Sequence, residues 1–360
     1  PVPIPGTAEV LIAVAAAGVN RPDLLQRMGK YPPPPGASDI PGLEVAGKII
    51  AQGPNCPVDT PPVGTRVCAL VTGGGYAAYV TAPVGQILAL PDTMDDIHGA
   101  GIPETLFTVY QNIVRLGRFT PDASILIHGG ASGIGTMAIQ MVRYLRGIFH
   151  PGRPSLEQGK GDPGPSSILE SAEGPGSRPP ARDCASARLA RDDTPSPALI
   201  VTCGTDDKAA ACLKLGATHA IHYHTEKFED RVMEITQGRG VDIVLDMVAG
   251  EYVARNIACM AYGGRHVTIA VQGGTNATID MRRVMTHNIT LTGSTLRARS
   301  VTDKTALRDA MLHDVWPGVV SGAIRPVIHA TFPLGDAAAA HTALERGDHV
   351  GKIILTNGKY

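Results

Sequence analysis

The sequence predicts an α/β protein in which a small β-rich barrel is joined to a doubly wound parallel sheet. Three observations lead to this fold class. Residues 1–97 carry short runs rich in β-branched residues, broken by Gly and Pro, which is typical of a small irregular barrel. From Met94 onward, strand-like and helical stretches alternate along the chain, as they do around parallel sheets. Residues 124–141, S-I-L-I-H-G-G-A-S-G-I-G-T-M-A-I-Q-M, indicate a strand, a glycine-rich turn and a helix.

In the first part of the chain we expect strands at residues 8–15, 45–51, 66–71 and 75–82. Between the first two, Tyr31 is followed by four prolines and Gly36, a stiff loop that cannot enter the interior of a sheet or helix. A helix is expected at residues 95–116, with Pro103 as a kink or break near its middle.

The parallel sheet is expected to contain strands at residues 124–128, 199–203, 219–223, 241–248, 266–270 and 289–293. Helices at residues 136–146, 206–215, 227–237 and 251–260 separate several of these strands. The tail from Val301 should hold a helix, a strand at 324–330, a helix at 334–345 and a strand at 352–356. Residues 148–197 are dominated by Gly, Pro, Ser and charge, so we expect a disordered insertion there. A parallel sheet can carry such an insertion, because a tenfold longer loop adds only about 2 kcal/mol of closure entropy.

The glycine-rich turn from Gly129 to Gly135 predicts a binding site for the pyrophosphate of a dinucleotide. Glycines let the backbone approach a ligand closely, and the following helix offers unpaired N–H groups and about half a positive elementary charge. The order G-x-x-G-x-G differs from the common G-x-G-x-x-G, so the prediction depends on the strand before the turn and the helix after it.

The composition narrows the class of protein. With 360 residues, 43% hydrophobic and 18% charged, the chain is typical of a soluble globular protein with two cores. A net charge of −1 argues against nucleic acid or an anionic membrane as the main partner. The six cysteines form no C-x-x-C pair, which favours free thiols in a reducing, cytoplasmic compartment. The chain begins at Pro1 rather than Met, so the sequence does not decide whether a targeting segment precedes it.

The end of the second parallel strand favours NADPH over NADH. NAD-binding folds usually hold the ribose 2′-OH with a carboxylate at this position, whereas this strand ends in Cys203-Gly204-Thr205. Lys208 follows three residues later, and Tyr223 ends the next strand. A hydroxyl, an ammonium and a phenol suit a 2′-phosphate. The nearby Asp206 and Asp207 are interpreted as helix-capping and first-turn charges rather than as ribose ligands.

The same glycines would also suit a short-chain dehydrogenase, and Tyr223-His-Thr-Glu-Lys227 has the letters of that family's Tyr-x-x-x-Lys pair. This alternative is less favoured. Tyr223 closes an expected strand instead of lying on a helix, the upstream catalytic serine has no counterpart, and more than a hundred residues precede the nucleotide turn.

Several stretches occur together in the order of one known family. They are residues 17–26 (A-G-V-N-R-P-D-L-L-Q), 41–47 (P-G-L-E-V-A-G), 129–135, 204–208, 215–217, 240–246, 291–297 and 351–355. Through them the chain resembles the zinc-free quinone oxidoreductases of the medium-chain dehydrogenase/reductase superfamily, over almost everything except residues 148–197. It is similar in particular to the stress-inducible NADPH:quinone reductases.

This resemblance implies a GroES-like substrate domain formed by residues 1–97 and completed by residues 297–360. It also implies a Rossmann domain for NADPH at residues 98–296. NADPH would deliver a hydride to a quinone or related conjugated carbonyl, without a metal. Asn20 and Thr108 would flank the nicotinamide, Tyr31 would line the acceptor pocket, and Glu44 would be a structural carboxylate near the cleft. The implied cofactor-binding residues are Asn20, Thr108, Gly130, Ser132, Gly133, Ile134, Gly135, Thr205, Lys208, Tyr223, Ala270, Ser294 and Leu296.

The residues at two positions argue against a catalytic zinc. Alcohol dehydrogenase relatives have a cysteine where Asn20 stands and a histidine where Leu43 stands, and neither residue can replace those ligands.

The resemblance further implies a homodimer formed through the strand at residues 289–293. Family members carry an additional strand before Pro1, whose loss would expose a sheet edge. Two functions therefore stay open: an active NADPH-dependent quinone reductase, or a dinucleotide-binding protein of the same fold with little or no catalysis.

Overall fold

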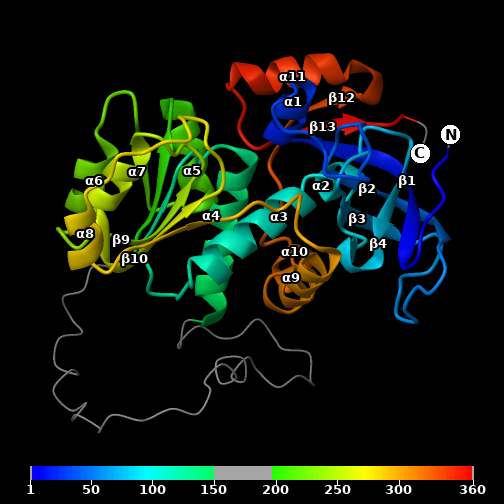
Figure 1. Cartoon of the computed structure of the whole chain (residues 1–360), viewed down its shortest axis with the longest axis horizontal. Coiled ribbons are helices and arrows are strands. Elements are labelled where there is room, and N and C mark those ends of the chain that lie inside the picture. The colour runs from blue at the N-terminus through cyan, green and yellow to red at the C-terminus, as the bar shows by residue number, and fades with distance from the viewer. Residues whose placement is uncertain (1, 150–196, 359–360) are drawn as a thin grey trace, which may run out of the picture.

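The computed structural model describes residues 2–149 and 197–358, and it contains two sheets that lie side by side with helices between and around them (Figure 1). The expected two-domain α/β fold is confirmed. The prediction for residues 148–197 falls almost entirely outside the described residues, as does Cys184. The exact domain boundaries at 97/98 and 296/297 stay predictions. Among the described residues, no helix is both long and apolar enough to cross a lipid bilayer.

The first sheet combines the N-terminal strands with the last two strands of the chain. Its path is β12-β13-β1-β2-β3-β5, and β4 pairs with β1. The long, almost entirely buried β1 is the centre of this sheet, pairing antiparallel with β2, β4 and β13. The strands are β1 (Glu9–Val19), β2 (Glu44–Gln52), β3 (Arg66–Leu70), β4 (Tyr79–Pro83), β5 (Ile87–Ala89), β12 (Ile328–Pro333) and β13 (Lys352–Thr356).

The second sheet has six parallel strands in the order β11-β10-β9-β6-β7-β8. Because β6 pairs with β7 on one side and β9 on the other, the strand order reverses at the carboxyl end of β6, where open α/β sheets bind ligands. The strands are β6 (Ile125–Ile127), β7 (Leu199–Cys203), β8 (His219–His222), β9 (Val241–Asp246), β10 (Met260–Thr268) and β11 (Thr290–Gly293).

The helices between the two sheets position the junction of the domains. The expected helix at residues 95–116 is broken into α2 (Asp96–Gly99), α3 (Pro103–Val109) and the π-helix η2 (Tyr110–Leu116). Both α2 and α3 pack on the first sheet, whereas η2 packs on the second, and α3 also contacts α4 (Gly133–Phe149). In Figure 1, α2, α3 and α4 run between the two sheets.

The remaining helices cover the outer faces and the ends of the sheets. They are α1 (Arg21–Arg27), η1 (Val84–Gln86), α5 (Asp206–Leu215), α6 (Phe228–Ile235), α7 (Tyr252–Ala258), α8 (Met281–Thr286), α9 (Val301–Asp314), α10 (Trp316–Val320), η3 (Leu334–Asp336) and α11 (Ala337–Arg346). The expected strand at 75–82 begins only at Tyr79, after a glycine turn. The expected strand at 324–330 begins at Ile328, because Pro326 cannot donate to a ladder.

Candidate functional site

The turn between β6 and α4 leaves backbone donors free at the switch point of the parallel sheet. The hydroxyl of Ser132 accepts from the N–H of Gly135 at 3.0 Å, so it caps α4. The N–H groups of Gly133 and Ile134, in the first turn, have no acceptor within the described part of the chain. These free donors and the positive end of a 17-residue helix can receive an anionic group.

The nucleotide turn is fastened to the first sheet through the start of β13. The N–H of Gly351 donates to the carbonyl of Ala131 at 2.8 Å, and Ser132 and Gly351 form an isolated β-bridge. The stem of Lys352 lies against Gly133, where an added Cβ would be 2.5 Å from the Lys352 Cδ. The turn therefore contacts both sheets of the protein.

Lys352, the next residue after Gly351, binds Asn20 and Glu44. Its Nζ donates to Asn20 Oδ1 at 2.7 Å and to Glu44 Oε1 at 2.6 Å, and Asn20 Nδ2 donates to the same Glu44 oxygen at 2.9 Å. All three side chains are buried, Glu44 completely. Such a network is held by its own hydrogen bonds and fixes the orientation of the Asn20 amide. The expected structural role of Glu44 fits this position.

Thr108 lies on α3, is partly buried and is tied to the second sheet through its backbone. Its carbonyl accepts from Asn112 Nδ2 at 2.8 Å, and Asn112 Oδ1 accepts from the hydroxyl of Ser294 at 2.8 Å. Ser294 in turn donates its N–H to the carbonyl of Thr268 at 3.1 Å. Asn112 was missed by the sequence reasoning. The two adjacent amides Gln111 and Asn112, in a helical stretch with apolar residues on both sides, were the signal that could have revealed it.

Tyr31 lies beside Arg297, in the loop after α1. The Arg297 guanidinium is 5.4 Å from the centre of the Tyr31 ring, a cation–π contact. Burial, reinforced by the charge of Glu104, raises the pKa of the Tyr31 hydroxyl. Leu296 is buried beside Arg297. Ala270, just after β10, and Ile134, in α4, are both partly buried.

A second group of predicted residues meets at the carboxyl end of β7. Thr205 caps α5 by accepting from the Lys208 N–H at 3.3 Å, and the Lys208 Nζ donates to the carbonyl of Gly347. An added Cβ on Gly204 would lie 2.6 Å from the Tyr223 hydroxyl, so this hydroxyl lies over the turn. We call Thr205, Lys208 and Tyr223 the ribose corner. Asp206 and Asp207 lie exposed in the first turn of α5, as expected.

The short-chain dehydrogenase alternative does not fit the structure. Tyr223 follows β8 and Lys227 is the N-cap of α6, so the two side chains do not lie one turn apart on a helix.

Comparisons with known proteins agree with the two-domain fold described above. A family model described as alcohol dehydrogenase GroES-like domain matches residues 6–92, and one described as zinc-binding dehydrogenase matches residues 215–355. The quinone oxidoreductase of Lama guanicoe is 28% identical over 357 residues, covering 98% of this chain and 90% of that protein. The chain belongs to the medium-chain dehydrogenase/reductase superfamily.

Two further proteins extend the similarity within the superfamily fold. The lovastatin diketide synthase of Aspergillus terreus is 26% identical over 96% of this chain, which is 12% of that much longer protein. The quinone oxidoreductase of Thermus thermophilus, solved alone and in complex with NADPH, superposes with a TM-score of 0.71 at 26% identity. That match covers 99% of this chain and 94% of the other.

Asn20 and Leu43, the two residues that the sequence led us to compare with zinc ligands, have other surroundings in the structure. Leu43 is buried in the core and Asn20 is engaged by Lys352 and Glu44. The part of the chain that the structure describes contains no cluster of three or more His, Cys, Asp or Glu residues suited to a metal ion.

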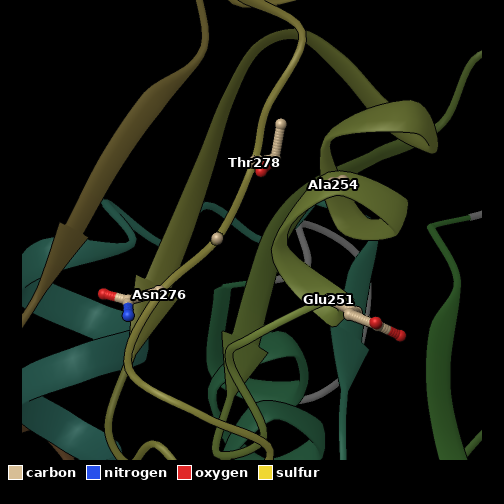
Figure 2. A pocket seen from close by; sticks show the side chains of 5 residues that line it. Glu251, Ala254, Asn276 and Thr278 are labelled. Atoms are coloured by element: carbon tan, nitrogen blue, oxygen red, sulfur yellow. The ribbon is translucent and has the colours of Figure 1, made fainter.

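Two surface hollows lie away from the predicted site residues. One of about 430 Å³ lies beside α7 and is lined by Glu251, Ala254 and residues 276–278 (Figure 2). The labelled side chains of Glu251 and Asn276 point in different directions rather than toward a common centre (Figure 2). The other, of about 250 Å³, lies around Arg118 and Arg265. None of the predicted site residues lines either hollow.

Proposed function

We propose that this chain binds NADPH and reduces quinones or related conjugated carbonyl compounds by hydride transfer, without a metal. The observation that carries the proposal is the link from Ala131 to Gly351 and from Lys352 to Asn20. It brings the turn between β6 and α4 and the Asn20 amide close together. A dinucleotide with its pyrophosphate at this turn would reach Asn20 with its nicotinamide. The quinone oxidoreductases among the relatives support the same reaction class.

The residues of this chain fit NADPH at both ends. The free N–H groups of Gly133 and Ile134 would receive the pyrophosphate, and the ribose corner would receive the 2′-phosphate. When bound, NADPH supplies a hydride from C4 of its nicotinamide. Asn20 and Thr108 would hold the ring in place, and Tyr31 would cover the acceptor and exclude water. Ala270, Ser294 and Leu296 follow the ends of β10 and β11 and would contact the nicotinamide.

Zinc independence is part of the proposal. The description of the matching family model names zinc binding, but Asn20 and Leu43 stand where the zinc-dependent relatives have a cysteine and a histidine. An amide that is already hydrogen-bonded and a buried aliphatic side chain cannot act as tetrahedral zinc ligands.

We also propose a cytoplasmic homodimer. The edge strand β11 of the parallel sheet can pair with its copy in a second chain, because its outer backbone groups have no partner strand among the described residues. Exposed apolar side chains gather in the segments around that edge; they are Tyr262, Val271, Met281, Met285 and Leu291. An exposed patch of this kind is typical of an interface between copies.

The test is to mix the protein with NADPH and 1,2-naphthoquinone and to follow absorbance at 340 nm. Loss of absorbance that depends on both the protein and the quinone, and that survives extensive dialysis against a chelator, supports the proposal. Tight NADPH binding without oxidation contradicts it and favours the alternative of a dinucleotide-binding protein without turnover.

A further inference from the structure

Glu104 is a partly buried carboxyl group that the function described so far does not use. It occupies the second position of α3, and its backbone N–H donates to Glu44 Oε2 at 2.9 Å. Within the described residues, its own carboxyl group has no hydrogen-bonding or ion-pair partner. A partly buried carboxyl group that no protein donor engages is available to a ligand.

The position of Glu104 is fixed between the residues proposed to hold the nicotinamide and the acceptor. Glu44, which anchors its backbone, is the residue that binds Asn20. Thr108 lies four residues later on the same helix and so on the same face. On the other side, the charge of Glu104 acts on the Tyr31 hydroxyl and on the Arg297 guanidinium.

The cations around Glu104 are bound to other groups. Lys352 donates to Asn20, Glu44 and the Val19 carbonyl. Lys304 donates to the carbonyl of Arg297 at 2.9 Å. Arg297 itself donates to the Thr72 carbonyl at 2.9 Å and to Gln26 Oε1 at 2.8 Å. Among the described residues, no neighbouring donor therefore neutralises the Glu104 carboxyl group.

We propose that Glu104 is the acid that gives the acceptor its proton after hydride transfer; this inference rests on the function proposed above. A hydride moves to the quinone and leaves it as a hydroquinone monoanion. The proton of the Glu104 carboxyl group then passes to the anionic oxygen, so that the carboxyl O–H bond breaks and the product O–H bond forms. Solvent returns a proton to the carboxylate, and the sum is NADPH + quinone + H⁺ → NADP⁺ + hydroquinone.

The electrostatic surroundings support this assignment. Burial raises the pKa of Glu104 to about 8, assisted by the negative charges of Glu44 and Asp23 and opposed by Lys352 and Lys304. These groups come from β2, α1, β13 and α9. On β3, which packs against α3, burial raises the pKa of the Cys68 thiol, so this thiol is neutral. At pH 7 the protonated form of the Glu104 carboxyl group is therefore favoured. An acid poised near the working pH is what general acid catalysis requires.

The test compares wild type, Glu104→Gln and Glu251→Gln with NADPH and 1,2-naphthoquinone between pH 6 and 9.5. Glu251 is exposed on the far side of the parallel-sheet domain and serves as the matched control. In wild type and in the control, kcat is expected to fall tenfold per pH unit above a pKa near 8. In Glu104→Gln, kcat at pH 7 is expected to be about 100-fold lower and independent of pH, with the Kd for NADPH unchanged.

Each outcome decides between the two proposals. An inactive wild type that binds NADPH overturns the proposed function and this inference with it. An active wild type whose kcat and pH profile are unaltered by Glu104→Gln overturns the role of Glu104 alone. If the variant does not fold, the wild-type profile decides: a kcat that does not change between pH 6 and 9.5 overturns the inference, and a solvent deuterium effect that disappears above pH 8 supports it.

Discussion

Lys352, on the last strand, donates its Nζ proton to Oε1 of Glu44 at 2.6 Å across a separation of 308 residues. Both side chains are buried, and the same ammonium holds the Asn20 amide. The pair thus joins an early strand and the last strand of one sheet directly under the nucleotide turn. A buried ion pair of this kind contributes more to a fixed arrangement than to net stability.

Replacing Lys352 with Met should lower the free energy of unfolding by about 3–5 kcal/mol, because it leaves the Glu44 charge buried without a partner. Urea denaturation followed by circular dichroism measures the loss. The double variant Lys352→Met/Glu44→Gln should recover part of it, since no uncompensated charge remains. Lys214→Met, at an exposed position of α5, is the control; equal losses in Lys352→Met and the control would contradict the network.

Lys208→Ala should raise the KM for NADPH about 10- to 100-fold and change the KM for NADH less than about twofold. The ammonium would form a charged hydrogen bond with the 2′-phosphate, worth about 1.5–3 kcal/mol, and NADH lacks that phosphate. Steady-state kinetics with both cofactors measures the change. Lys214→Ala lies on the same helix and should behave as wild type. If Lys208→Ala keeps the wild-type preference for NADPH over NADH, the assignment of the ribose corner is wrong.

Asn112→Ala should destabilise the protein by about 1–3 kcal/mol and lower kcat. The change removes the link between the Thr108 carbonyl and the Ser294 hydroxyl and leaves buried polar atoms without partners. Ser294→Ala removes one hydrogen bond and should cost less, about 1 kcal/mol. Thermal unfolding and steady-state kinetics of both variants check the order, and a larger loss in Ser294→Ala would disprove the role of Asn112 as the bridging group.

The stability of the parallel-sheet domain should fall below pH 6.5 through His128. This side chain is fully buried, with Nδ1 3.0 Å from the Thr202 hydroxyl and Nε2 2.7 Å from Asn256 Oδ1. Burial lowers the pKa of His128 from 6.5 in the folded state. Below pH 6.5 the unfolded chain therefore binds a proton at His128 that the folded chain does not bind. The free energy of unfolding falls as the pH is lowered below 6.5.

The measurement is urea unfolding of wild type and His128→Gln between pH 8 and 5. Wild type should lose about 1.4 kcal/mol more per pH unit than the variant below pH 6.5, the value for one proton. Parallel curves for the two proteins across the whole range would exclude His128 as the group responsible.

Local patterns were enough to predict both sheets. The strands β7 and β13 and the helix α5 begin and end where expected, because each has a continuous apolar run or a clear cap. The short elements α1, α8 and β5 were not expected. Segments this short are marginal on their own and form only through packing against the rest of the fold.

The contacts of the candidate site were beyond the reach of local patterns. Asn20 and Glu44 could be named from the sequence, but their joint partner Lys352 is over three hundred residues away. Ser294 and Asn112 are 182 residues apart. Glu104 follows a proline at a helix start, where an acidic residue is explained by the helix alone. Only the tertiary fold reveals that its carboxyl group lies near Glu44, Asp23 and Lys352 without a partner among the described residues.

The place of β13 beside β1 also sets the order in which the chain can acquire its structure during synthesis. The Lys352 ammonium reaches the carbonyl of Val19, 333 residues earlier. At about 5–20 residues per second, a ribosome adds β13 roughly 15–70 s after β1 has been made. During that interval the part of β1 that β13 covers, from Ala16 to Val19, has no neighbouring strand on that edge and can pair with another nascent chain. Chaperones that shield strand edges would therefore raise the yield of this protein more than agents that act on the finished fold.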